Sequence, residues 1–295
     1  MFKKTMIAGL VGMMATMSAQ AVTLQAGDLK FTINNYDSGT VGYPATPSNG
    51  MVCDSITACD TAGSLPATNS YGADTWGIFS VESITRISDA SLIWQASAGK
   101  YLTGLFGGLQ DAYVENATSS FTGLTVAALT TGGWLNLYSN TNQYDPSQGP
   151  SGRTGEFVYT GITGGTLMLS AIFAGSAING LDYTYYSTFK PNSSYAGSGQ
   201  GFLDVTGGVW GQTSGFGGIT LDTNSLTDTK GNKRDLFVDV TFNDVNGAAS
   251  ILGWTVTSAG QVKGNAIPEP GSMALAGLGL IGLAALRRRK QAKRE

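Results

Sequence analysis

Carboxylates are the main side chains with catalytic potential in this chain, because none of its 295 residues is a histidine. Ser-His-Asp triads, Cys-His dyads and the common histidine-ligated zinc and iron sites are therefore excluded. Residues 22–266 hold fifteen aspartates and three glutamates, the latter being Glu82, Glu115 and Glu156. A glycosidase needs two carboxylates roughly 5 to 10 Å apart across a cleft. Most of these acids lie near turns, where solvated carboxylates are common, so we expect no enzyme. A carbohydrate-active hydrolase with paired carboxylates is the second alternative.

One oxygen-rich turn is a weak candidate for a calcium site. The stretch LDTNSLTD brings Asp222, Asn224 and Asp228 close together in sequence. Carboxylate and amide oxygens suit a hard cation, although the spacing does not match an EF-hand loop. Asx turns explain the same residues more simply. We therefore expect no cofactor, with calcium as the weak exception.

Aromatic residues give the best hint of a binding surface. In LDYTYYSTF, Tyr183 and Tyr185 share one face of a predicted strand, and Trp134 shares a face with Tyr138 in a second one. Rows of exposed aromatic rings stack on sugar rings. Strands also use such residues for packing, which is the commoner role. The first alternative function is therefore a surface glycan-binding module built on Tyr183, Tyr185 and Trp134.

The elements that must position these residues read as short β-strands. In DLFVDVTFNDV, apolar residues alternate with polar ones, so one face of the predicted strand carries Leu236, Val238, Val240 and Phe242. This period of two indicates a half-buried strand. Similar runs recur through residues 29–258, separated by Gly- and Pro-rich stretches such as residues 190–201, which are typical of loops. We expect an all-β, antiparallel sandwich or jelly roll over residues 22–258, followed by a linker at 259–266.

The N-terminal residues predict export. Lys3 and Lys4 precede an apolar run, which ends near Ala19 and Ala21. This is the pattern of a secretory signal peptide, here a signal helix over residues 1–21 with cleavage after Ala21. In an oxidising compartment, Cys53 and Cys59 are expected to form a disulfide, and so short a loop contributes about 2 to 3 kcal/mol.

The C-terminal residues predict a membrane address. Gly271 to Leu286 contain no charge, and a basic cluster follows at Arg287, Arg288, Arg289 and Lys290. As a single transmembrane helix this run extends about 24 Å, and the cluster would stop its transfer on the cytoplasmic side. Before the run, Pro268 and Pro270 flank Glu269 and keep the chain extended. Such a stiff acidic segment would sit at the outer face of the membrane.

This order of Pro-Glu-Pro, apolar helix and arginine cluster closely resembles the PEP-CTERM sorting signal. The resemblance covers residues 267–295, with the motif at 268–270, the helix at 271–286 and the basic tail at 287–295. It implies recognition by an exosortase, a membrane-embedded enzyme that cleaves near the motif. It also implies a Gram-negative, biofilm-forming source in which exopolysaccharide is a potential partner.

Charge and tail together define the expected role. Residues 22–266 carry nine Lys and Arg against eighteen Asp and Glu, a net charge of −9, which makes nucleic acid an unsuitable partner. We expect an inner-membrane intermediate that is delivered to the outer surface or the extracellular matrix. The expected function there is structural or adhesive.

Overall fold

The computed structural model describes residues 24–39, 75–119, 123–175, 182–189, 197–211, 219–244, 253–254 and 256–268. Within these residues the regular elements are β-strands and one 3-10 helix, η3 (Pro146–Gly152). The prediction of an all-β fold is confirmed. The predicted signal helix, the predicted transmembrane helix and both cysteines lie outside the described residues.

The strands vary greatly in length. Their bounds are β1 (Gly27–Gly39), β2 (Thr75–Arg86), β3 (Leu92–Gln95), β4 (Tyr101–Ser119), β5 (Gly123–Asn140), β6 (Arg153–Gly155), β7 (Val158–Tyr159), β8 (Thr166–Ala174), β9 (Tyr185–Phe189), β10 (Gly197–Gly207), β11 (Ile219–Thr220), β12 (Leu226–Thr227), β13 (Lys233–Arg234), β14 (Leu236–Asp244) and β15 (Val256–Pro268).

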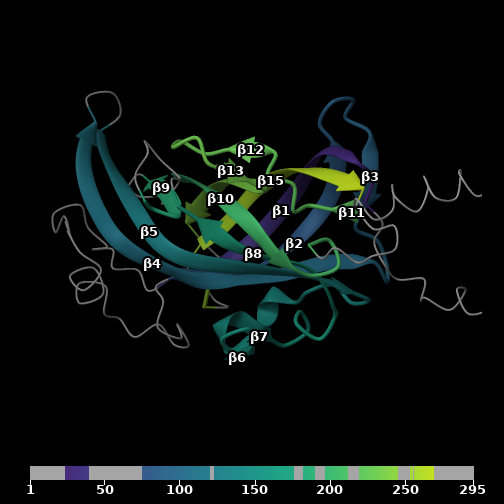
Figure 1. The fold of residues 1–295 in the computed structure, drawn as a ribbon. Helices are drawn as coiled ribbons and strands as arrows, with labels where there is room; N and C mark the ends of the chain where they lie inside the picture. Colours follow the sequence, from purple (N-terminus) through teal and green to yellow (C-terminus); the bar gives the residue numbers. More distant parts are fainter. Residues whose placement is uncertain are drawn as a thin grey trace, which may run out of the picture.

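Eight of these strands close into an antiparallel barrel (Figure 1). Their order is β1-β15-β14-β10-β8-β5-β4-β2, and β2 pairs back with β1. The closing pair runs from Leu29 opposite Arg86 to Gly39 opposite Thr75. The expected sandwich or jelly roll was therefore wrong. A barrel strand has one buried and one outer face, as a sandwich strand does, so the alternation of residues does not distinguish the two folds.

The interior of the barrel is filled by apolar side chains that face glycines. Leu236, Val238 and Val240 of β14 are buried there, as the alternation predicts. A Cβ atom at Gly104 would lie 2.1 Å from the ring of Phe79, and one at Gly264 would lie 2.4 Å from a methyl group of Leu236. Glycine is thus required where a large side chain crosses a narrow barrel.

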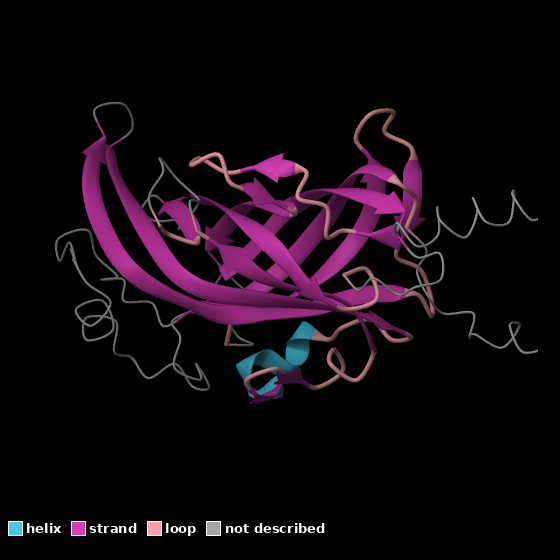
Figure 2. Ribbon diagram, viewed as in Figure 1, coloured by secondary structure: helices cyan, strands magenta, loops and turns pink. Residues whose placement is uncertain are grey.

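The segment 141–165, which carries η3, β6 and β7, lies against the outside of the barrel wall (Figure 2). A second, smaller core is buried between this segment and the wall. The indole of Trp254 donates a hydrogen bond to the carbonyl oxygen of Pro146 at 2.8 Å. The guanidinium of Arg153 lies 4.5 Å from the ring centre of Trp76. The buried members of this aromatic cluster are Trp76, Ile78, Leu105, Tyr138, Tyr144, Tyr159, Ile162 and Trp254.

The predicted linker at residues 259–266 was wrong. These residues belong to β15, which pairs with β1 on one side and β14 on the other. Val262, Gly264 and Ala266 face the interior and are buried. The folded body therefore continues to Pro268 and does not end at residue 258. The loop predicted at residues 190–201 was wrong in the same way for its last part, since β10 begins at Gly197.

Candidate functional site

The sorting tripeptide begins inside the fold. Ile267 and Pro268, the last residues of β15, lie opposite Thr220 and Ile219 of β11. Proline donates no backbone hydrogen bond, so the end of a strand is one of the few positions in a sheet that accept it. Two residues, Glu269 and Pro270, separate this strand from the apolar run. The recognition motif therefore follows the barrel without a spacer.

The N-terminal end of the described chain meets the C-terminal end at the same side of the barrel. Gly27, at the start of β1, lies opposite Ala266 near the end of β15. Figure 1 shows the end of β15 beside β11 and near β3. We call this end the exit rim and define it by Leu24, the turn at residues 87–91, β11, and Ile267 and Pro268. The two segments predicted to engage the membrane thus join the barrel at one rim.

Apolar side chains seal the barrel interior at the exit rim. Trp210 is buried and packs against Phe31, with ring centres 6.2 Å apart. Its carbonyl oxygen accepts hydrogen bonds from the backbone N–H of Leu221 at 2.7 Å and from the hydroxyl of Thr220 at 3.1 Å. These bonds fix β11 in place. The sorting motif is therefore paired with a strand that is itself held firmly.

A buried carboxylate, Asp235, holds the chain that follows β11. One oxygen accepts the backbone N–H groups of Thr223 at 2.7 Å and Asn224 at 2.6 Å. The other oxygen accepts the N–H of Val205 in β10 at 2.8 Å. Asn224 has a φ of 51°, which asparagine tolerates better than most residues. Asp235 is 3% exposed, so these three donors replace the water that its charge would otherwise require.

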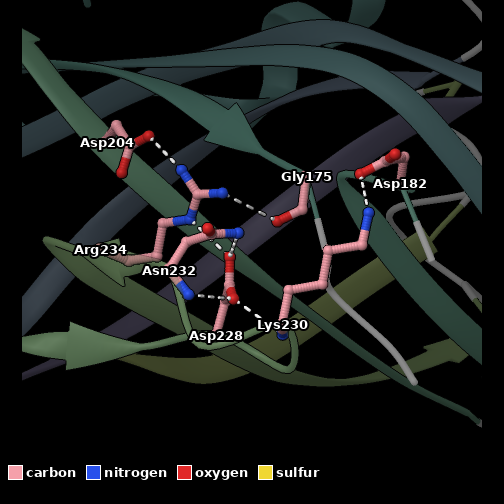
Figure 3. Close-up of polar contacts among 7 residues, drawn as sticks. All are labelled: Gly175, Asp182, Asp204, Asp228, Lys230, Asn232 and Arg234. Carbon is pink, nitrogen blue, oxygen red and sulfur yellow. Dashed lines mark hydrogen bonds and ion pairs between the residues drawn. The ribbon is translucent and has the colours of Figure 1, made fainter. Parts of the chain in front are cut away.

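An arginine joins the β12–β13 hairpin to the barrel wall (Figure 3). Arg234 donates from Nε to Asp228 at 2.9 Å and from Nη1 to Asp204 of β10 at 2.7 Å. Asp228 also accepts the backbone N–H groups of Lys230 and Asn232, both at 2.9 Å. Burial opposes ionisation of Asp228, but hydrogen bonds from Asn232, Lys230 and Arg234 outweigh it and lower its pKa. The network is structural, since its carboxylates are occupied by internal donors.

These contacts account for most of the residues in the calcium candidate. The carboxylate of Asp228 is saturated by N–H donors, and the backbone of Asn224 is bound to Asp235. Asp222 is exposed as a residue, but partial desolvation of its carboxyl group, and then the neighbouring charges of Asp235 and Asp204, raise its pKa. Within the part of the chain that the structure describes, no three acidic or cysteine side chains group as a metal site. An Asx-type turn accounts for Asp228, and the calcium site itself stays a prediction.

The aromatic row that would form a glycan platform is not present. Tyr185 lies inside the barrel, where its ring meets Phe173 edge-on at 5.7 Å, and burial raises its pKa. Trp134 lies on the outer wall and packs against Phe157 at 4.7 Å. Tyr183 is partly buried and precedes β9. Two of the three candidates therefore face opposite sides of the wall, and packing is the role of both.

A polar cluster at the opposite end of the barrel was missed from the sequence. Asn35, Asp37 and Ser258 lie on the inner face, and we call them the polar end. Asn35 donates to Asp37 at 2.5 Å, and the hydroxyl of Ser258 donates to Asn35 at 2.5 Å. Burial raises the pKa of Asp37 to about 7, against the opposing effect of the bonds from Asn35 and Ser258. The signal available was the break from apolar to polar residues along β1.

Most of the predicted sorting residues lie outside the described part. Of the tripeptide, Pro268 is described; Glu269, Pro270, the cluster at 287–290, the cleavage residues Ala19 and Ala21, and the pair Cys53 and Cys59 are not. No helix among the described residues is long and apolar enough to cross a bilayer.

By its fold, the described part is a closed antiparallel barrel with its chain ends at one rim. The model of the PEP-CTERM protein-sorting motif matches residues 266–290. The chain is therefore a PEP-CTERM domain-containing protein, and the motif supports an exported, membrane-transiting protein that is processed by exosortase. No curated protein and no solved structure matches the chain.

Proposed function

We propose that this chain is an exported surface protein in which the barrel is the delivered body and the tail beyond Pro268 is a processing signal. The observation that carries the proposal is that β15 completes the barrel and ends within the matched motif. The delivered body and the sorting motif are adjacent, and they share only Ala266, Ile267 and Pro268. A tail of this kind can be removed after folding without the loss of a barrel strand.

The same register favours a cleavage site C-terminal to Pro268. A cut before Ile267 would separate β11 from its partner residues. It would also make Ala266, which is 1% exposed, carry the new C-terminal carboxylate. A cut after Pro268 leaves every described strand intact. The expected mature protein therefore begins near Val22 and extends at least to Pro268.

Fractionation of the native host, with and without its exosortase, tests the proposal. We expect the full-length chain to accumulate in the inner membrane when the enzyme is absent, and a shortened chain to reach the surface when it is present. Intact mass of the surface form then locates the cut. A surface form that retains the basic tail, or one that is delivered equally well without the enzyme, contradicts the proposal.

The role at the surface is proposed to be structural or adhesive, in the outer envelope or extracellular matrix of a Gram-negative bacterium. A filled barrel with carboxylates bound to internal donors supports a scaffold better than a catalyst. Exopolysaccharide is the proposed matrix partner. Retention of the processed protein on purified host polysaccharide, compared with retention on unrelated dextran, tests this; equal retention on both contradicts it.

A further inference from the structure

We propose that the exit rim is a lipid-facing surface, and that it rests on the outer face of the bilayer while the precursor is anchored through its tail. Ile87, Leu92 and Ile267 would lie in the apolar part of the interface, and Lys30 and Lys263 would meet the lipid phosphates. This inference rests on the proposed function, because it concerns the precursor before processing.

The exit rim concentrates exposed apolar side chains. Within the described residues, seven large apolar side chains are exposed, and four of them stand at this end of the barrel: Ile87, Leu92, Val209 and Ile267. Leu92 is 57% exposed and Ile87 is 47% exposed. They belong to the β2–β3 hairpin, whose turn is bound to β1 by a 2.9 Å hydrogen bond from the N–H of Ile87 to the carbonyl oxygen of Asp28. The apolar residues are therefore held next to the point where the chain leaves.

The length of the connection determines what covers these side chains. Glu269 and Pro270 separate Pro268 from the uncharged run that begins at Gly271. An extended residue spans at most about 3.5 Å, so the three residue steps from the Cα of Pro268 to the Cα of Gly271 reach about 10 Å. A barrel tethered this closely cannot hold its exit rim away from the bilayer surface. The lipid interface is thus the surface that the rim meets first.

The charges behind the rim complement an anionic lipid surface. Lys30 of β1 lies directly opposite Lys263 of β15, on the outer face of the barrel. Like charges in this position repel each other, and among the described residues no ion pair joins either lysine to an acid. Lysines behind an apolar edge can reach lipid phosphates through their flexible side chains. Nearby, Asp89 is paired with Arg86 at 3.2 Å.

Photo-crosslinking of the full chain in vesicles tests the inference. The chain is reconstituted into vesicles of phosphatidylethanolamine and phosphatidylglycerol, with benzoylphenylalanine in place of Leu92. The matched control carries the same probe in place of Ile172, which is 48% exposed on the outer wall of β8. We expect the yield of phospholipid adducts, measured by mass spectrometry, to be at least about tenfold higher at position 92. Equal yields, or no adduct at position 92 in chains that float with the vesicles, would overturn the inference.

Flotation distinguishes this failure from failure of the proposed function. If the full chain does not float with the vesicles, the tail is not a membrane anchor and both proposals fall. A second arm tests the lysines: the adduct yield at position 92 should fall about threefold when phosphatidylcholine replaces phosphatidylglycerol. The double variant Lys30→Gln, Lys263→Gln should abolish this lipid dependence. If the double variant keeps the full dependence, the assignment of the lysines is wrong.

Discussion

The two ends of the barrel differ in the side chains that close its interior. At the exit rim, Trp210 and Leu221 seal the interior, and the buried Asp235 is bound by three backbone N–H groups. At the polar end, Asp37 is partly buried on the inner face, and it accepts hydrogen bonds from two neutral side chains, Asn35 and Ser258. Backbone donors stabilise an ionised carboxylate well, whereas few and neutral donors leave burial dominant.

The difference concerns how each end responds to its surroundings. The exit rim must hold β11 and β15 in register while the adjoining tail is processed, and a carboxylate bound by three backbone N–H groups holds the chain after β11 against β10. The polar end contains a carboxyl whose pKa is about 7, so its charge changes near neutral pH. The free energy of unfolding should therefore depend on pH through Asp37 at the polar end. At the exit rim it should depend on the backbone hydrogen bonds to Asp235.

The largest expected effect is from removal of the anchor at the exit rim. Asp235→Ala leaves three backbone N–H groups without acceptors in a buried site, so we expect the free energy of unfolding to fall by about 4 kcal/mol. Urea titration followed by tryptophan fluorescence measures the change. The control Asp222→Ala, at an exposed carboxylate in the same loop, should change stability by less than about 0.5 kcal/mol. If the two variants lower the free energy of unfolding equally, the three backbone hydrogen bonds to Asp235 do not stabilise the exit rim.

The second effect concerns Asp37. Its pKa is near 4 in the unfolded chain and about 7 in the folded protein, so between these values the folded state holds the extra proton. The stabilisation is complete below about pH 4 and is lost as the pH rises through 7. We expect the free energy of unfolding to fall by up to about 3 kcal/mol from pH 5 to 7, at about 1.4 kcal/mol per unit.

Urea titrations at pH 5, 6, 7 and 8 measure this dependence. Asp37→Asn keeps the shape of the side chain and cannot ionise, so the difference between the native chain and this variant isolates the contribution of Asp37. If the two chains show the same pH dependence, the polar end does not titrate and the contrast between the two ends is lost.

A smaller effect is expected at Gly260, in the strand that joins the two ends. A Cβ atom there would lie 2.5 Å from the carbonyl oxygen of Asp239 and 2.7 Å from the Cα of Val240. Because these atoms belong to the neighbouring strand, the backbone must shift, and Gly260→Ala should cost about 2 kcal/mol. Gly164→Ala is the control, since no atom lies within 4 Å of its Cβ position. If Gly260→Ala does not change the free energy of unfolding, close packing of β15 against β14 at this position is contradicted.

The smallest effect is expected at the ion pairs of the β12–β13 hairpin. Arg234→Gln removes one of four donors to Asp228, so we expect a loss of about 1 kcal/mol in thermal or urea unfolding. Lys230→Gln breaks the more exposed pair with Asp182 and should cost less than about 0.5 kcal/mol. If Lys230→Gln lowers the stability more than Arg234→Gln does, the solvent exposure of an ion pair does not determine its contribution here.

Much of the barrel could be predicted at the level of single strands. The alternation in β14 identified its inner face correctly, because a strand with one buried face has apolar side chains at every second residue. The same reasoning failed for β15 and for the start of β10, where the inner positions are glycines such as Gly199, Gly260 and Gly264. Glycine indicates a loop when local propensity is considered alone. Here it makes room for Tyr185, Val240 and Leu236.

The candidate sites divide in the same way. The tail could be identified from sequence, because its recognition depends on the order of residues along the chain, and the match at residues 266–290 confirms it. The aromatic and calcium candidates could not be judged from sequence. Whether Tyr185 and Trp134 share a surface depends on the sides of the wall that they occupy. Whether Asp228 is free depends on Arg234 and on the turn of its own hairpin.

The sequence by itself determined the all-β character, the motif-bearing tail and the absence of histidine chemistry, because each depends on composition or on residues close together in the chain. Tertiary structure alone decided that the sheet closes, that β15 runs into the sorting motif, that Asp235 is buried and that Asp37 lies on the inner face of the barrel. These features depend on pairings such as that of Leu29 with Arg86, between residues far apart in sequence. No local pattern encodes such a pairing, because many registers satisfy the same alternation and only packing of the whole barrel selects one.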